Sequence, residues 1–299
     1  MVSVVIPTYK RPDQLLSAVN SVLQQTYKDF EIVVVNDNKD DHETISALLG
    51  TLKDPRIKYL KNERKKGGNG ARNTGILHSN GEFIAFLDDD DTWFPEKLAE
   101  QVSKMDSLDN SWAGCYCGWE TDGVLYTAGN DGDLISPFLT KKCPLGASST
   151  LLIRKSVIKE SGLWDEDLNR FQDYLFFIAI IVNYKFGFVE KPLLRINGHN
   201  IPGFDSLKIS NDQYLEKVSL FKKIVDHPDY SYFLARQYRD MALYAAINGY
   251  VKDVNLFLRK SVKYKILPLK NYLSVLVYFV NYFTFKFEFG LSQRKPKSH

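Results

Sequence analysis

The stretch GEFIAFLDDDD, from Gly81 to Asp91, joins an apolar run directly to four consecutive aspartates. The apolar part predicts a buried strand over 82–87, which would end where the carboxylates begin. Four carboxylates at one point repel one another unless a cation lies among them. Carboxylate oxygens suit Mg²⁺ and Mn²⁺, and Mg²⁺ commonly bridges to substrate phosphates. The run therefore predicts a divalent-cation site; the alternative is a solvated acidic turn before the next helix.

The segments around this run predict an α/β fold. Short β-rich runs alternate with amphipathic stretches, the pattern of strand–helix–strand units on a mostly parallel sheet. Strands are predicted over 2–6, 30–35, 57–60 and 82–87, and helices over 12–25, 41–52, 69–79 and 95–105. Because ligands bind at the carboxyl ends of strands in such sheets, Thr8, Tyr9 and Asp37 should share one rim with the aspartates. On its own, Asn36-Asp37 is an ordinary turn pair.

The second half of the chain is less regular. Strands are predicted over 113–120 and 149–153, and a helix over 169–183 that is apolar nearly all round and therefore buried. Past about residue 209 the apolar residues follow helical spacing only. We therefore expect one domain over about 1–205 and a helical C-terminal segment over 206–299.

Composition excludes several classes of protein. The 299 residues are 44% hydrophobic, enough for one large domain with an appendage, and a net charge of +3 is too small to indicate nucleic-acid binding. Three cysteines do not make a disulfide framework. No secretory signal opens the chain, and no window has the roughly 18–20 apolar residues of a spanning helix. A cytoplasmic location is expected.

Five motifs, in this order along the chain, resemble those of the inverting glycosyltransferases of family 2, which have the GT-A fold. They are SVVIPTY at 3–9, SVLQQTY at 21–27, FEIVVVND at 30–37, GARNTGI at 70–76 and GEFIAFLDDDD at 81–91. The likeness covers about residues 1–200 and does not extend to the C-terminal helices. It implies a GT-A domain of the Rossmann-like kind, with a mostly parallel sheet flanked by helices.

The resemblance also implies a UDP-sugar donor and its ligands. Thr8, Tyr9 and Asp37, with the adjoining Pro7, would hold the uracil, and Arg72 would lie near the base or its phosphates. Asp88 and Asp89 would take ribose and sugar hydroxyls, and Asp90 would bind Mn²⁺ or Mg²⁺, with a neighbouring aspartate of the run as the alternative ligand. Asn36 departs from the second aspartate that these enzymes often carry.

Asp173 is the implied general base. Inverting transfer needs one carboxylate that takes a proton from the acceptor hydroxyl as it attacks the sugar's C1. In the family, the corresponding stretch ends in an acidic pair; here Gln172 replaces the first member and Asp173 is retained. The alternative is an acid that only complements the dipole of the helix it opens.

The remaining implied site residues lie in the second half of the domain. His199 corresponds to a histidine that often reaches the metal or diphosphate, and Arg195 could neutralise phosphate charge as the leaving group departs. Trp164, Ser148 and Gln172 would line the acceptor side. Trp164 is equally a candidate core residue, and His199 is equally a solvated loop histidine.

Together these residues predict a metal-dependent enzyme that transfers a hexose or N-acetylhexosamine from a UDP-sugar to a glycan or lipid-linked saccharide in surface-polysaccharide synthesis. A nucleotidyltransferase acting on sugar phosphates and a non-catalytic nucleotide-sugar-binding module are the alternatives. Aromatic residues with basic flanks over 268–299 suit contact with an anionic membrane. The same residues would also suit a homo-oligomer interface or packing onto the catalytic domain.

Overall fold

The computed structural model describes residues 1–143, 147–197 and 203–284, with side chains as far as residue 280. The predictions for His199 and for 285–299 therefore lie outside the described residues. The chain divides into two compact units, Met1–Gly198 and His199–His299.

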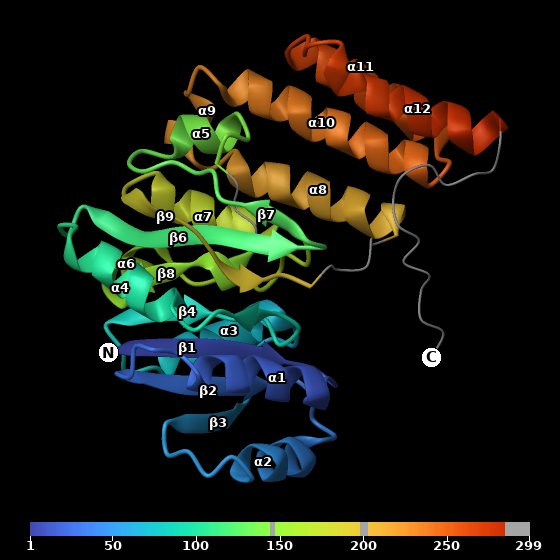
Figure 1. The fold of residues 1–299 in the computed structure, drawn as a ribbon. Coiled ribbons are helices and arrows are strands. Elements are labelled where there is room, and N and C mark those ends of the chain that lie inside the picture. The colour runs from blue at the N-terminus through green and yellow to red at the C-terminus, as the bar shows by residue number, and fades with distance from the viewer. Residues whose placement is uncertain (144–146, 198–202, 285–299) are drawn as a thin grey trace. The chain divides into compact units, whose positions relative to one another are not determined.

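Nine strands in the described part of the first unit form one sheet, in the order β3-β2-β1-β4-β8-β6-β9-β5, with β7 paired to β6 (Figure 1). The pairs β1–β2, β1–β4 and β2–β3 are parallel, whereas β8 is antiparallel to both β4 and β6. The sheet is therefore parallel among β1 to β4 and mixed in the strands that follow. The strands are β1 Val2–Thr8, β2 Phe30–Asn36, β3 Ile57–Lys61, β4 Phe83–Phe86, β5 Thr92–Trp93, β6 Trp112–Thr121, β7 Val124–Tyr126, β8 Leu152–Arg154 and β9 Lys185–Arg195.

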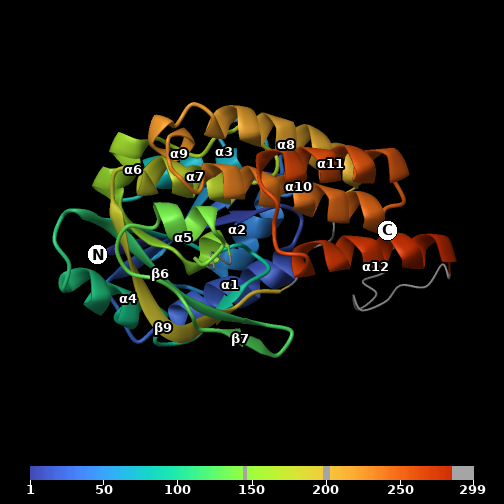
Figure 2. The same cartoon turned by 90° about the horizontal axis from the view of Figure 1, so that it is seen from above.

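Helices cover both faces of this sheet. Figure 2 shows α3, α6 and α7 on one face and α1 and α4 on the other. One apolar cluster joins α1, α2 and α4 to alternate residues of the central strands, because successive strand side chains point to opposite faces. The helices are α1 Pro12–Leu23, α2 His42–Gly50, α3 Gly68–Leu77, α4 Lys97–Asp106, α5 Ile135–Leu139, α6 Lys155–Ser161 and α7 Gln172–Ile181.

Glycine allows α3 to pack very close to the sheet. A Cβ atom at Gly75 would lie 2.4 Å from Cγ1 of Val5 in β1, and one at Gly70 would lie 1.9 Å from the carbonyl oxygen of Lys65. Neither contact is sterically tolerable, so these two positions require glycine. The close packing brings the side chains of α3 near the carboxyl ends of β1 and β4.

One predicted strand is wrong in part. Residues 149–153 were expected to be extended, but Ser148–Thr150 form a 3-10 turn and β8 begins only at Leu152. The reason is local hydrogen bonding: the N–H groups of Thr150 and Leu151 donate to the carbonyls of Ala147 and Ser148. The hydroxyl of Ser149 donates to Asp91, so the turn is also held by the aspartate run.

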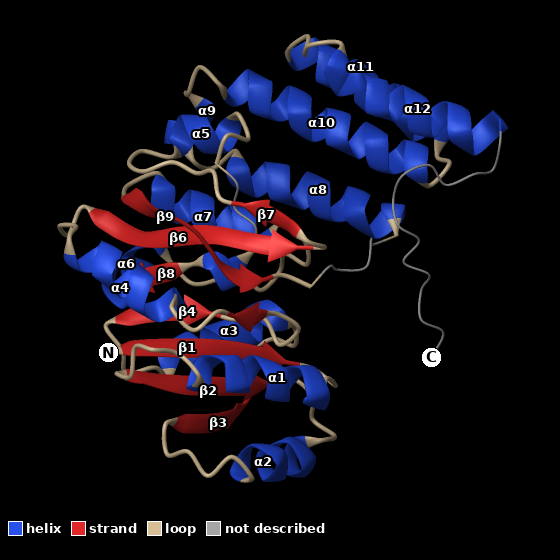
Figure 3. Ribbon diagram, in the orientation of Figure 1, coloured by secondary structure: helices blue, strands red, loops and turns tan. Residues whose placement is uncertain are grey.

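The described residues of the second unit form helices joined by loops, with no strand among them, as Figure 3 shows. Its core contains Phe204, Tyr214, Phe233, Met241 and Phe257, all nearly fully buried. Among the described residues, none of the helices combines the length and apolar character needed to cross a bilayer. The helices are α8 Phe204–Val218, α9 Lys222–Val225, α10 Tyr230–Ile247, α11 Val251–Tyr264 and α12 Lys270–Thr284.

Candidate active site

The carboxyl ends of β1, β2 and β4 meet at one rim of the sheet. Thr8, the last residue of β1, lies opposite Asn36, the last residue of β2. The N–H of Asp37 donates to the carbonyl of Thr8 at 2.9 Å, and the Thr8 hydroxyl donates to Asp89 at 2.8 Å. Tertiary structure thus brings together side chains from three motifs that are far apart in the sequence.

Asp37 is held in place by two donors. Asn62 Nδ2 donates to its carboxylate at 2.6 Å and the N–H of Gly67 donates at 2.9 Å. Tyr9 lies on the same rim with its side chain 40% exposed, and the amino groups of Lys10 and Lys66 are 5.5 and 5.2 Å from its ring centre. An oriented carboxylate, an exposed ring and two cations are groups that can bind a base and phosphates.

The first and last aspartates of the run, Asp88 and Asp91, contact other residues of the protein. Asp88 forms an ion pair with Arg72 and accepts a 3.4 Å hydrogen bond from Ser148. Asp91 is fully buried and accepts from the Ser149 hydroxyl at 2.7 Å and from the N–H of Asn197 at 3.0 Å. These contacts fix the turn that carries the run.

The two middle aspartates of the run, Asp89 and Asp90, both form ion pairs with the side chain of Arg11. The guanidinium of Arg11 lies 3.0 Å from Asp89 and 2.8 Å from Asp90. Burial raises the pKa of Asp89, and burial together with the neighbouring Asp88 raises the pKa of Asp91 to about 8. The run is therefore short of positive charge, and an added cation would relieve the repulsion within it.

These residues fit a hard divalent cation that is shared with a substrate. In the part of the chain that the structure describes, no group of three or more His, Cys, Asp or Glu side chains surrounds a common metal position. Mg²⁺ is commonly held by one or two carboxylates together with substrate phosphates and water. The 2.8 Å pair between Arg11 and Asp90 indicates that the Asp90 carboxylate binds positive charge.

Arg72 links the aspartate run to the predicted base. Its guanidinium is buried, which opposes the charged form, but the carboxylates of Asp88 and Asp173 raise the pKa of Arg72. The guanidinium also stacks over the ring of Trp164 at 4.9 Å. A permanently charged arginine therefore interacts both with the carboxylate of Asp88, after β4, and with that of Asp173 in α7.

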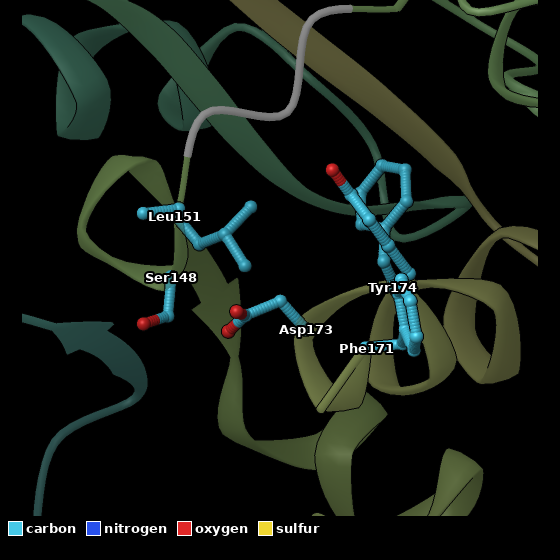
Figure 4. Close-up of a pocket in the computed structure, with 7 residues that line it drawn as sticks. Ser148, Leu151, Phe171, Asp173 and Tyr174 are labelled. Atoms are coloured by element: carbon cyan, nitrogen blue, oxygen red, sulfur yellow. The ribbon is translucent and has the colours of Figure 1, made fainter. Parts of the chain in front are cut away.

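A pocket beside Asp173 adjoins this group (Figure 4). It encloses about 130 Å³, far more than the roughly 15 Å³ that one water needs by a comparable measure. Asp173 lies in the first turn of α7, and Figure 4 shows its carboxylate turned toward Ser148. The pocket is lined by Ala147, Ser148, Leu151, Phe171, Asp173, Tyr174 and Phe177.

Of the other predicted site residues, those that the structure describes do not all line this pocket, and several have partners elsewhere. Trp164 is only 2% exposed and stacks on Phe176, so it is a core residue in this structure. Gln172 opens α7 and does not line the pocket. Arg195 ends β9 and pairs with Glu120 at 3.3 Å. Pro7 is buried within β1, and His199 lies outside the described residues.

Several residues of the site were not predicted. Arg11 lies two residues after the first motif, so the argument from strand ends could have found it. The hydrogen bonds that Ser149 and Asn197 donate to Asp91 had no such signal in the sequence, because they depend on the segments next to β8 and β9 lying near the end of β4. The sequence gives no signal for Phe171 and Tyr174 as site residues either, because two aromatic residues near an apolar helix are usually core residues.

Comparison with known proteins agrees with this geometry. The family described as Glycosyl transferase family 2 matches residues 3–161. An uncharacterized glycosyltransferase of Rickettsia typhi is 31% identical over 88% of this chain and 85% of its own. The UDP-Glc:alpha-D-GlcNAc-diphosphoundecaprenol beta-1,3-glucosyltransferase WfgD of Escherichia coli is 35% identical, over 52% of this chain and 60% of its own. The structure of TarS 1-349 from S. aureus in complex with UDP-GlcNAc has a TM-score of 0.58 at 16% identity, covering 94% of this chain and 91% of that one.

Proposed function

Because the chain belongs to glycosyl transferase family 2, we propose that it transfers a hexose or N-acetylhexosamine from a UDP-sugar to a saccharide hydroxyl, with inversion at C1. The observation that carries the proposal is the link between the strand-end rim and Asp173. Arg72 and Ser148 both contact Asp88, while the Arg72 guanidinium interacts with Asp173 and Ser148 shares its pocket. A donor held by the rim would therefore present its sugar toward that pocket.

The UDP-sugar donor would bind at the rim formed by the carboxyl ends of β1, β2 and β4. Asp37 would accept a hydrogen bond from the imide N–H of uracil, beside the ring of Tyr9. Lys66, whose amino group lies 5.2 Å from the centre of that ring, would offset charge on the phosphates. Asp88 and Asp89 would accept hydrogen bonds from ribose and sugar hydroxyls. Asp90 would hold Mg²⁺ or Mn²⁺, which when bound neutralises charge on the departing UDP.

The acceptor half uses the pocket. Asp173 would take the proton of the acceptor hydroxyl while that oxygen attacks C1 on the side opposite UDP. The buried guanidinium of Arg72 interacts electrostatically with this carboxylate, and the interaction raises the pKa of Arg72. Ser148 would help to orient the hydroxyl.

A screen for UDP release tests the proposal. UDP-glucose and UDP-GlcNAc are incubated with the full chain and MgCl₂ or MnCl₂, with and without simple glycosides as acceptors. Acceptor-stimulated UDP release supports transfer. Release of pyrophosphate instead would indicate a nucleotidyltransferase, and tight UDP-sugar binding without any release would indicate a binding module.

We further propose that the acceptor is lipid-linked and that residues 268–299 contact an anionic membrane surface. The named relative WfgD acts on a diphosphoundecaprenol-linked sugar. In α12, Leu273, Leu276, Val277 and Val280 are exposed and follow helical spacing along one face. Residues 254–284 contain five basic side chains and no acidic one, which favours anionic lipid over an isologous contact with a second copy.

A further inference from the structure

Phe171 has an unusual backbone conformation directly beside the predicted base. Its φ and ψ are 61° and 12°, the left-handed region, at the N-cap position of α7. A bulky side chain rarely adopts this region, because its Cβ crowds the backbone. Such strain persists only where the surrounding structure imposes it, and it is concentrated at functional sites.

The strained backbone puts the Phe171 ring beside that of Tyr174. The two ring centres are 6.5 Å apart with 26° between the planes, and both residues line the pocket that contains Asp173. Figure 4 shows the two rings together on one side of Asp173, with Ser148 and Leu151 on the other. Phe138 supports the Tyr174 ring by an edge contact at 5.9 Å, so the ring has a defined position although Tyr174 is 39% exposed.

The pocket is therefore divided by polarity. The polar groups of the pocket, the Asp173 carboxylate and the Ser148 hydroxyl, lie on the same side as Leu151, whereas the opposite side carries aromatic rings. A pyranose ring is divided in the same way, since its C–H groups form an apolar face and its hydroxyls project from the edge. The electron-rich face of an aromatic ring attracts such weakly positive C–H groups.

We propose that Phe171 and Tyr174 form a platform for the apolar face of the acceptor pyranose, so that one of its hydroxyls points at Asp173. This inference rests on the proposed function and specifies the acceptor as a sugar ring rather than a lipid or protein hydroxyl. The platform and Asp173 belong to the same helix turn, because residues 171 and 174 flank residue 173. The platform thus fixes the distance between sugar and base.

The alternative is that the two rings only pack the start of α7. The two roles differ in what Phe171→Gly would do. Glycine adopts a positive φ without strain, so relief of strain offsets the lost ring contact and the helix start is kept. A packing role predicts a less stable protein with all activities reduced together, whereas a platform role predicts a selective loss of acceptor binding.

The test uses methyl 2-acetamido-2-deoxy-α-D-glucopyranoside as the acceptor probe, with binding followed by saturation-transfer NMR. We expect saturation at the ring C–H protons of one face in the full chain. Phe171→Gly and Tyr174→Ala should each weaken probe binding at least tenfold, and Phe171→Tyr should retain it. Thermal midpoints should stay within a few degrees of the unsubstituted protein. UDP affinity and acceptor-free hydrolysis of the UDP-sugar should stay within twofold.

Tyr126→Ala is the matched control, since Tyr126 is 40% exposed and stacks on Trp119 in β6, outside the pocket. It should leave probe binding unchanged. Unchanged probe binding in Phe171→Gly, or an equal loss of probe and UDP binding with a large fall in thermal midpoint, would overturn the platform. Absence of UDP binding in a protein that still binds the probe through these rings would instead overturn the proposed donor.

Discussion

Replacement of Asp173 by asparagine separates chemistry from binding and folding. The substitution keeps the shape of the side chain and removes the carboxylate that would accept the acceptor proton. General-base catalysis is commonly worth about 10²–10⁴-fold, so turnover should fall by that factor, equal to about 2.7–5.4 kcal/mol in the barrier. Donor affinity should not change, because Asp37 and the aspartate run follow β2 and β4 and are not part of α7.

The structure also limits the effect of Asp173→Asn on stability. Asp173 lies in the first turn of α7, where an acid contributes about 0.3–1 kcal/mol through the helix dipole. Arg72 keeps its ion pair with Asp88, so its buried charge is not left uncompensated. The thermal midpoint should therefore fall by no more than about 4 °C.

The assay combines UDP release with calorimetric UDP-sugar titration. Gln172→Glu is the matched control: it changes the adjacent residue, adds an acid to the same turn and should be tolerated. Turnover within a few-fold of the unsubstituted chain in Asp173→Asn would refute the base assignment. Lost donor affinity with normal turnover at saturating donor would assign Asp173 to the donor site instead.

Three further predictions follow from the aspartate run and from α12. Asp90→Ala should abolish transfer and metal-dependent UDP binding while the fold is kept. Calorimetry with and without MnCl₂ measures the metal-dependent part of UDP binding. Normal activity of this variant in EDTA would exclude the metal role of Asp90. Asp91 has a folded pKa of about 8 against an ordinary 3.8, so its protonated form is favoured by folding. The contribution of Asp91 to the free energy of unfolding is complete below pH 3.8 and is lost as the pH rises through 8. The loss is at most about 1.4 kcal/mol per pH unit. Denaturant unfolding in EDTA between pH 5.5 and 8.5 should therefore show a steeper loss of stability in the unsubstituted chain than in Asp91→Asn, and parallel profiles would contradict the assignment. Replacement of Leu273, Leu276 and Val280 together by serine should reduce flotation with anionic vesicles while UDP release is kept. The control Leu125→Ser, at an exposed leucine of β7, should change neither flotation nor UDP release. Equal flotation of the two variants would exclude α12 as the membrane contact.

The strand-end motifs could be predicted from the sequence because each is a local signal. An apolar run followed by polar residues marks a strand and its end, and parallel strands place their ends on one rim. The positions of Thr8, Asp37 and Asp88 near one another follow from that rule alone. The start of α3 after Gly67 is equally local, since Gly67 has a φ of 128° that favours glycine.

The contacts that make these residues a site depend on tertiary structure. Arg72 reaches Asp88 because Gly75 lets α3 lie against β1. Asp91 is held in a buried position by Ser149, in the turn before β8, and by Asn197, after the end of β9. Each of these pairs joins segments that are separated by many residues, so no local periodicity encodes them. The sequence by itself determined which residues stand at the ends of the strands. Packing of helices and antiparallel strands onto the sheet decided which charges are buried, which are paired, and that two aromatic rings lie beside Asp173, because burial and pairing depend on neighbours that only the folded chain provides.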